Sequence, residues 1–135
     1  MKSFHHKEKV LFQHCDPAGI VFYPRYFEMV NTVVETWFSE VLGHPFETLH
    51  GPMKVGVPTV HFEVSFHAPS LHGDVLDFEL TPTRIGSASV NLLIVASSAE
   101  QKRLTMNTTL VFIKLPEMSP TPWPELLRQR MSELD

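Results

Sequence analysis

The stretch HCDPAGIVFYPRYF, residues 14–27, marks the point where the sequence changes from the period of a strand to the period of a helix. Before it, apolar residues alternate with their neighbours over Lys7 to His14, which predicts a first strand. From Pro24 onward, apolar residues recur at steps of three and four, which predicts an amphipathic helix. Asp16 is therefore expected where the strand stops, shortly before the helix begins.

The predicted helix has one apolar face. Pro24 suits the first helical position, and Gly43 can adopt the left-handed conformation that ends a helix. The apolar stripe covers about 100° of the helical wheel and consists of Phe27, Val30, Val34, Trp37, Phe38 and Val41. The opposite side carries Glu28, Thr32, Glu35, Thr36 and Ser39. We expect the apolar face to be buried and the other to meet solvent.

Four runs with strand character follow the helix: Thr59 to His67, Val75 to Arg84, Ser87 to Ser98, and Gln101 to Leu115. In the first run apolar and polar residues alternate, as in a half-buried strand. Short connections between the runs predict antiparallel neighbours. Pro124 to Leu134 is expected to form a short final helix. This order predicts an α+β fold in which an antiparallel sheet wraps around one long central helix.

Composition limits the class of protein. The chain of 135 residues fits a single domain over residues 1–135, and its 43% hydrophobic and 19% charged residues suit a packed core. A formal net charge of -4, with the 11 Lys and Arg residues dispersed, argues against a nucleic-acid binder. No apolar run approaches the ~20 residues of a membrane helix, and the first residues lack the apolar core of a signal peptide. With Cys15 as the single cysteine, we expect a cytoplasmic protein without a membrane partner.

The last two strands are apolar on both sides in places, for example at Leu92 and Leu93. One helix cannot cover both faces of the sheet. The pattern therefore predicts a homo-oligomer, either a homodimer or a homotetramer, that buries the remaining apolar area.

Asp16 is the first candidate for chemistry. A carboxylate at a strand end, beside the unpaired N–H groups of a helix beginning near Tyr23 and Pro24, has the parts of an acyl-transfer site. The alternative is that Asp16 is a turn residue or a helix cap, a common role of aspartate. The residues alone leave both roles open.

The run Asp16-Pro17-Ala18-Gly19-Ile20-Val21-Phe22-Tyr23-Pro24, with Tyr26 two residues later, resembles the signature of the 4-hydroxybenzoyl-CoA thioesterases of the hotdog fold. The helix that follows, the Gly56-Val57-Pro58 segment and the order of strands to Leu115 are also similar to that family. The resemblance implies a thioesterase that hydrolyses an acyl-CoA, with an aromatic or a short to medium-chain acyl group, and that needs no cofactor and no metal.

The resemblance also implies roles for single residues. Asp16 is expected to act as nucleophile or as general base for water, and the backbone N–H of Tyr23 to polarise the thioester carbonyl. The substrate-binding positions are Gly19, Ile20, Val21, Phe22 and Tyr26, which border a dry acyl pocket. Arg84, together with Lys102 and Arg103, is a candidate for the nucleotide of coenzyme A, although most of the basic cluster of the family is absent after Arg84. His61 is a candidate for the acyl pocket of a neighbouring subunit, or a solvent-facing residue of the sheet.

Other residues can be weighed as catalytic groups or metal ligands. Cys15 is a weaker nucleophile candidate, because the adjacent His14 points to the opposite strand face. Glu35 on the helix could replace Asp16, as in other hotdog thioesterases, or belong to a solvated face. His61 and His67 are about 20 Å apart along a strand, too far to share a metal ion. A non-catalytic acyl-CoA-binding module and a dehydratase are the alternative functions.

Overall fold

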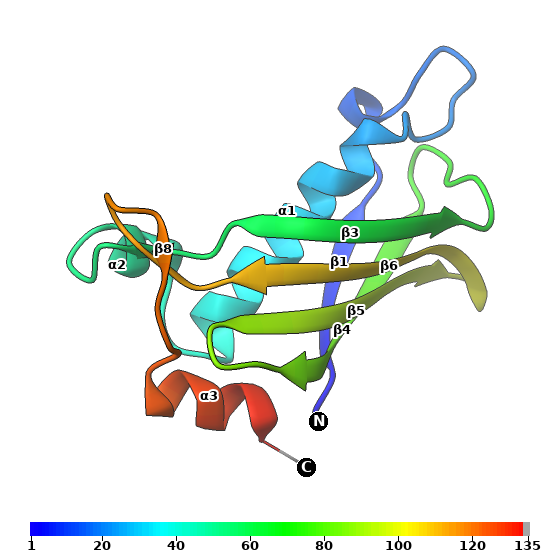
Figure 1. Ribbon diagram of the computed structural model, residues 1–135. Helices are drawn as coiled ribbons and strands as arrows, with labels where there is room; N and C mark the ends of the chain where they lie inside the picture. The colour runs from blue at the N-terminus through cyan, green and yellow to red at the C-terminus, as the bar shows by residue number, and fades with distance from the viewer. Residues whose placement is uncertain (134–135) are drawn as a thin grey trace.

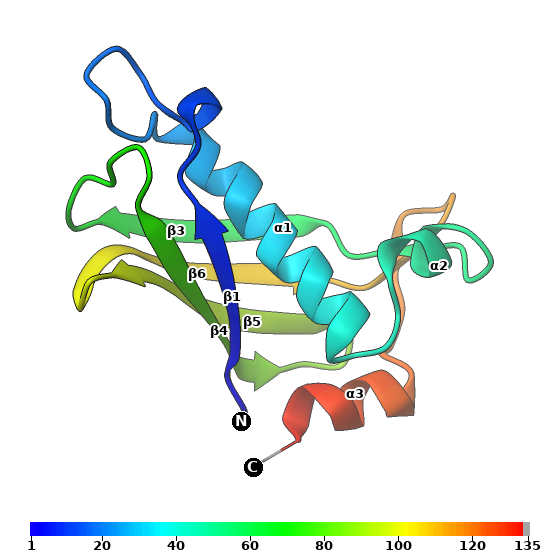
Figure 2. The same ribbon diagram turned by 180° about the vertical axis from the view of Figure 1, so that it is seen from behind.

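A computed structural model describes residues 1–133 of the chain. In chain order the elements are β1 (Phe4–Lys9), a 3-10 turn (Phe12–His14), α1 (Pro24–Glu40), α2 (Phe46–His50), β2 (Val55–Gly56), β3 (Thr59–Phe66), β4 (Val75–Ile85), β5 (Ser89–Ser98), β6 (Gln101–Val111), β7 (Ile113–Lys114), β8 (Ser119–Pro120) and α3 (Glu125–Ser132). Five strands form an antiparallel sheet in the order β1-β4-β5-β6-β3. Helix α1 lies across one face of this sheet (Figures 1 and 2). The expected α+β architecture is confirmed.

Helix α1 buries a broader face than the predicted stripe. Its buried residues are Tyr26, Met29, Val30, Val33, Val34, Trp37 and Phe38. Phe27 is only half-buried and Val41 is exposed, so the buried face is turned toward Tyr26, Met29 and Val33. The reason is that the sheet curves around the helix and reaches side chains beyond a 100° stripe. Full burial of each large apolar side chain contributes about 1.5–3 kcal/mol.

Strand β1 differs from the prediction. It spans Phe4–Lys9 instead of Lys7 to His14, because it pairs with β4 only as far as Val75, where β4 begins. Beyond that point Val10 turns inward and is fully buried, whereas Phe12 lies in the 3-10 turn and is exposed. Strand pairing therefore overrides the local alternation of apolar residues.

Strand β3 has the predicted bounds almost to the residue, but the expected half-burial is wrong. Seven of its eight residues are exposed, with Val60 at 59%, Phe62 at 48% and Phe66 at 48%. These side chains face α1 as the alternation predicts, since the Phe62 ring lies 5.2 Å from the Phe27 ring. The strand is at the edge of the sheet and pairs only with β6, so the helix covers it incompletely.

The three central strands follow the prediction within a few residues. In β5 the side chains of Val90, Leu92, Ile94 and Ala96 are fully buried, and the residues between them are partly exposed. These partly exposed residues, which include Leu93 and Val95, lie on the outer face of the sheet. No helix of the described residues 1–133 lies over that face in Figure 1.

The C-terminal segment packs under the sheet. The Trp123 ring stacks on Phe112 at 4.7 Å, and Leu127 and Met131 of α3 are buried. Helix α3 confirms the expected final helix, although Leu134 lies outside the described residues. Within residues 1–133, no helix is both long and apolar enough to span a membrane.

Candidate active site

Asp16 begins a tight turn. The N–H of Asp16 donates to Ile20 O at 2.9 Å, and the N–H of Gly19 donates to Asp16 O at 2.9 Å. Gly19 has a φ of 80°, which a residue with a side chain rarely adopts. A Cβ at Gly19 would meet no atom within 4 Å, so the conformation of the backbone is the reason for glycine here. We call residues 16–19 the Asp16 turn.

The Asp16 carboxylate is half-buried and takes part in its own turn. Oδ1 accepts the N–H of Ala18 at 2.9 Å, which is the side-chain contact of an Asx turn. The turn-residue role is therefore real. Oδ2 has no hydrogen-bond partner among residues 1–133, so one oxygen is left for chemistry.

Tyr23 is the N-cap of α1 and has a free backbone donor. Its φ and ψ are −53° and −34°. The next residue, Pro24, has no N–H, and the N–H groups of Arg25 and Tyr26 donate to Phe22 O and Tyr23 O. The N–H of Tyr23 finds no acceptor in the described chain. A free donor at the positive end of a 17-residue helix favours a developing negative charge.

A hollow of about 340 Å³ lies at the start of α1. It is lined by Ile20, Val21, Tyr23, Tyr26, Phe66, His67, Ala68 and Pro69. Four of the predicted site residues thus meet at one place, and the Tyr23 and Tyr26 rings lie 6.4 and 5.7 Å from Phe66. Of these lining residues, Val21 and Tyr26 are buried.

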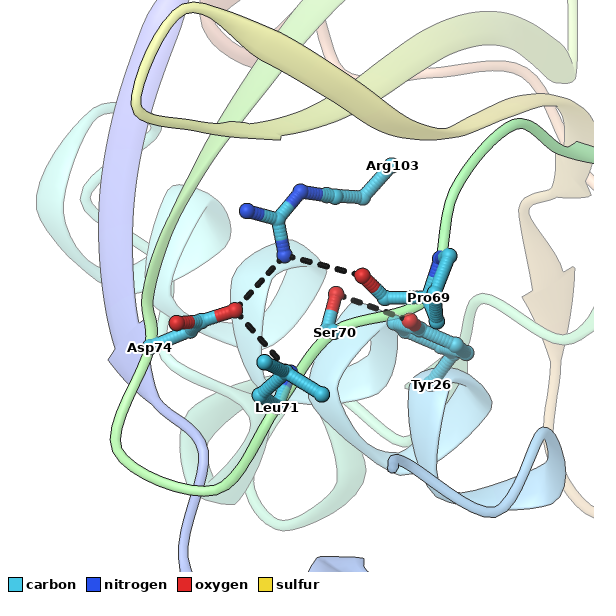
Figure 3. A network of polar contacts seen from close by, with 6 residues as sticks. All are labelled: Tyr26, Pro69, Ser70, Leu71, Asp74 and Arg103. Atoms are coloured by element: carbon cyan, nitrogen blue, oxygen red, sulfur yellow. Dashed lines mark hydrogen bonds and ion pairs between the residues drawn. The ribbon is translucent and has the colours of Figure 1, made fainter. Parts of the chain in front are cut away.

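The loop between β3 and β4, residues 67–74, holds the Asp16 turn in place. Ser70 O accepts the N–H of Val21 at 2.9 Å, and the N–H of His72 donates to Gly19 O at 3.3 Å. Tyr26 donates its hydroxyl to the buried Ser70 Oγ at 2.9 Å (Figure 3). The 67–74 loop therefore contacts both the turn that carries Asp16 and the first turn of α1.

Arg103 of β6 lies beneath the same loop. Its Nη1 donates to Asp74 Oδ2 at 2.7 Å and to Pro69 O at 3.2 Å (Figure 3). This hydrogen bond, and a second from the N–H of Leu71, hold the pKa of Asp74 below its ordinary value. Arg103 is buried in this pair. Its expected contact with the nucleotide of coenzyme A stays a prediction.

Three predicted residues lie away from the hollow. Phe22 is exposed, and its ring meets the ring of Tyr23 edge to face with the two centroids 5.5 Å apart. His61 is about 16 Å from Phe66 along β3, where its Nε2 lies 3.6 Å from Glu63 Oε1. Arg84 is exposed at the far end of β4, about 30 Å along the strand from the 67–74 loop. Neither His61 nor Arg84 can reach the hollow within one chain.

His67 was missed as a site residue. The predicted strand included it on the face of His61, but β3 ends at Phe66 and the alternation stops there. Its ring lines the hollow, and its Nε2 lies 2.8 Å from Thr105 Oγ1. The nearby Pro69 was the sequence signal that the strand was about to end.

A larger hollow of about 450 Å³ lies further along α1, between that helix and β3. Its apolar lining includes Phe27, Val30, Val34, Phe62, Met106 and Leu110, and its polar lining consists of Asn31, Glu35, Thr59 and Thr108. Glu35 is exposed, as the solvated-face reading predicts, yet it borders this hollow. No local pattern points to Asn31 or Thr108, because these two residues come from elements far apart in the chain.

The structure speaks against Cys15 as nucleophile. Cys15 Sγ lies 3.5 Å from Leu11 O, and His14 Nδ1 accepts the N–H of Leu11 at 2.9 Å. The imidazole of His14 is therefore engaged with the backbone and does not contact the thiol.

Relatives found by comparison with known proteins are named as hydrolases or thioesterases of aromatic acyl-CoAs. The 1,4-dihydroxy-2-naphthoyl-CoA hydrolase of Synechocystis is 29% identical, over 100% of this chain and 99% of the relative. The crystal structure of a 1,4-dihydroxy-2-naphthoyl-CoA thioesterase from Synechocystis superposes with a TM-score of 0.90 at 26% identity, covering 99% and 98% of the two chains. The 4-hydroxybenzoyl-CoA thioesterase of Pseudomonas sp. strain CBS-3 is 30% identical over 58% of this chain and 56% of its own.

These findings confirm the expected hotdog architecture and the enzyme class, thioester hydrolase. The thioesterase-like superfamily matches residues 10–131, which is nearly the whole sequence. The chain therefore belongs to the thioesterase-like superfamily.

Proposed function

We propose that the protein hydrolyses an aromatic acyl-CoA to the free acid and coenzyme A, with Asp16 and the Tyr23 N–H as its catalytic groups. The observation that carries this proposal is the unpaired N–H of Tyr23, a residue that lines the same hollow as Ile20, which directly follows the Asp16 turn. An oxyanion donor and a carboxylate are the two parts that thioester hydrolysis requires, because a thiolate leaves without a strong general acid.

The reaction can begin in two ways with the same residue. In the first, Asp16 Oδ2 attacks the carbonyl carbon, the thiolate of coenzyme A leaves, and water hydrolyses the resulting anhydride. In the second, Asp16 takes a proton from a water molecule, the hydroxide attacks the carbonyl, and the thiolate leaves and is protonated. In both, the Tyr23 N–H donates a hydrogen bond to the carbonyl oxygen and stabilises the negative charge that develops there.

Two observations favour an aromatic acyl group. The relatives with named substrates act on hydroxylated aromatic acyl-CoAs. The larger hollow has the right character for such a group, since the rings of Phe27 and Phe62 border it and offer edge and face contacts. The polar groups of Asn31 and Thr108 on its wall suit a ring with hydroxyl substituents.

A second copy of the chain is part of this proposal. Val60, Phe62 and Phe66 leave an apolar row exposed along an unpaired sheet edge, which soluble proteins ordinarily cover. We propose a homo-oligomer that covers β3 and closes the open side of both hollows. In such an assembly, His61 and Arg84 of one copy can approach the site of another, which one chain does not allow.

The test is the Asp16→Asn variant, assayed for thiol release with benzoyl-, hydroxybenzoyl- and naphthoyl-CoA. Asparagine keeps the Oδ1 acceptor for Ala18, so the turn is preserved while base and nucleophile are lost. We expect kcat to fall by about a hundredfold or more. The matched control is Glu35→Gln, which removes a carboxylate of α1 that borders the larger hollow and should change kcat by less than threefold.

If the native protein binds these thioesters without hydrolysing them, the proposal is overturned and the protein is a binding module. Full activity in Asp16→Asn, with loss in Glu35→Gln, would transfer the catalytic role to the helix carboxylate.

A further inference from the structure

The 67–74 loop has little apolar packing of its own. Ser70 is fully buried, but Leu71 is 54% exposed, and His67, Pro69 and His72 are exposed as well. Hydrophobic burial therefore does not fix the shape of this loop. Its conformation depends on polar contacts, and the side chain of Arg103 makes two of them.

Arg103 acts on both ends of the loop. One nitrogen, Nη1, contacts Pro69 O on the side that leads to Ser70, and Asp74 Oδ2 at the entry to β4. The same Asp74 oxygen accepts the N–H of Leu71 at 2.9 Å, which closes the loop on itself. At the start of the loop, the N–H of His67 donates to the backbone oxygen of Arg103 at 2.9 Å.

The contacts that hold the site lie between these anchors. Ser70 accepts the N–H of Val21 and the hydroxyl of Tyr26, and His72 donates to Gly19 O. Ile20 and Leu71 also form an antiparallel bridge. The Asp16 turn and the first turn of α1 are thus tied to one loop, which is tied in turn to Arg103.

Burying the charged side chain of Arg103 has a desolvation cost that its contacts with Asp74 and Pro69 must offset, which points to a role beyond holding the fold. The Arg103 side chain is only 8% exposed, and its Nε has no hydrogen-bond partner in the described residues. A buried ion pair is weak support for a fold, because apolar residues of similar volume often do as well or better. What an apolar pair could not supply is a directional contact to a carbonyl and a carboxylate at the two ends of one loop.

We propose that Arg103 and Asp74 are positioning residues, which clamp the 67–74 loop and thereby fix the Asp16 carboxylate relative to the Tyr23 N–H. This inference rests on the proposed function for its effect on catalysis. Its structural part concerns the loop and the Asp16 turn and does not depend on hydrolysis. A small displacement of either catalytic group lowers transition-state stabilisation more than it lowers ground-state binding.

The experiment uses Arg103→Met, which keeps the length and the apolar packing of the side chain but removes both donors. We expect kcat with an aromatic acyl-CoA to fall at least tenfold while KM changes less than threefold. The amide of Val21 should exchange with solvent at least tenfold faster, measured by NMR. Arg103→Lys restores one donor to Asp74 and should recover part of both losses.

The matched control is Arg128→Met. Arg128 is a half-buried arginine of α3 that donates to Gly86 O, at the opposite end of the molecule from the Asp16 turn. This variant should change neither kcat nor the exchange of Val21 by more than threefold. If Arg103→Met does not fold, Asp74→Asn replaces it. Asp74→Asn keeps an acceptor for the N–H of Leu71 but loses the charge. It should lower kcat and speed the exchange of the Val21 amide, each by less than Arg103→Met does.

The two proposals fail in different ways. Absence of thioesterase activity in the native protein would overturn the proposed function, and the exchange of Val21 would still decide whether Arg103 holds the turn. A folded Arg103→Met variant with native exchange at Val21, or with faster exchange but native kcat, would overturn the positioning role.

Discussion

The hydroxyl of Tyr26 donates to Ser70 Oγ at 2.9 Å, although the two residues are 44 positions apart in the chain. This bond joins the first turn of α1 to the 67–74 loop, which also binds the backbone of Val21 (Figure 3). The candidate site is therefore a small polar assembly of three segments that meet only in the folded chain.

Removal of the Tyr26 hydroxyl is expected to destabilise the fold. Tyr26→Phe leaves Ser70 Oγ fully buried without this donor, which costs about 1–2 kcal/mol of the free energy of unfolding. Urea denaturation followed by tryptophan fluorescence measures the change. Tyr23→Phe is the control, because the Tyr23 side chain is 59% exposed and its loss should alter stability by less than about 0.5 kcal/mol.

The role of Tyr23 is predicted to lie in its backbone. Tyr23→Pro removes the free N–H, and its φ of −53° is one that proline adopts. No internal hydrogen bond is lost, so the fold should persist while kcat falls by about a hundredfold or more. Tyr23→Phe keeps the N–H and should keep kcat. Equal activity in both variants would contradict an oxyanion donor at this position.

The ion pair between Arg103 and Asp74 should make the stability of the fold depend on pH. The hydrogen bond from Arg103, and then that from Leu71, lower the pKa of Asp74 below its ordinary value of 3.8. A lowered pKa means that the ion pair contributes its full stabilisation above the unfolded pKa and loses it as the pH falls through the folded pKa. The difference in unfolding free energy between native protein and Asp74→Asn should therefore be constant from pH 7 to about pH 5. It should shrink below about pH 4. A difference that grows on acidification would speak against this pair.

Self-association should depend on the edge strand. Val60→Lys places a charge on the exposed apolar row of β3 and should shift sedimentation from an oligomer to a monomer. Met118→Lys, at an apolar residue outside β3 that is also exposed, should leave the native sedimentation unchanged. A Val60→Lys protein that still sediments as the native oligomer would place the interface elsewhere.

Much of the fold was readable from local patterns. The period of three and four from Pro24 located α1, and the alternation after Thr59 located the next four strands within a few residues. The positive φ of Gly19 agrees with a turn at Asp16, and the signature residues Ile20, Val21, Tyr23 and Tyr26 do meet at one hollow. Each of these features depends on residues close together in the chain, so the sequence displays it directly.

The remaining features depend on distant partners. Strand β1 stops at Lys9 because β4 begins at Val75, and β3 stays exposed because it has a neighbour on one side only. Arg103 pairs under the 67–74 loop with Asp74, 29 residues away, and no local pattern around Arg103 indicates that partner.

Local patterns were enough to locate the helix, the strands and the turn that carries Asp16, because hydrophobic periodicity and backbone preference act over a few residues. The edge strand of the sheet, the buried charges and the loop that supports the site emerge only when the chain is folded. Those outcomes are set by contacts between segments tens of residues apart, which no local pattern encodes.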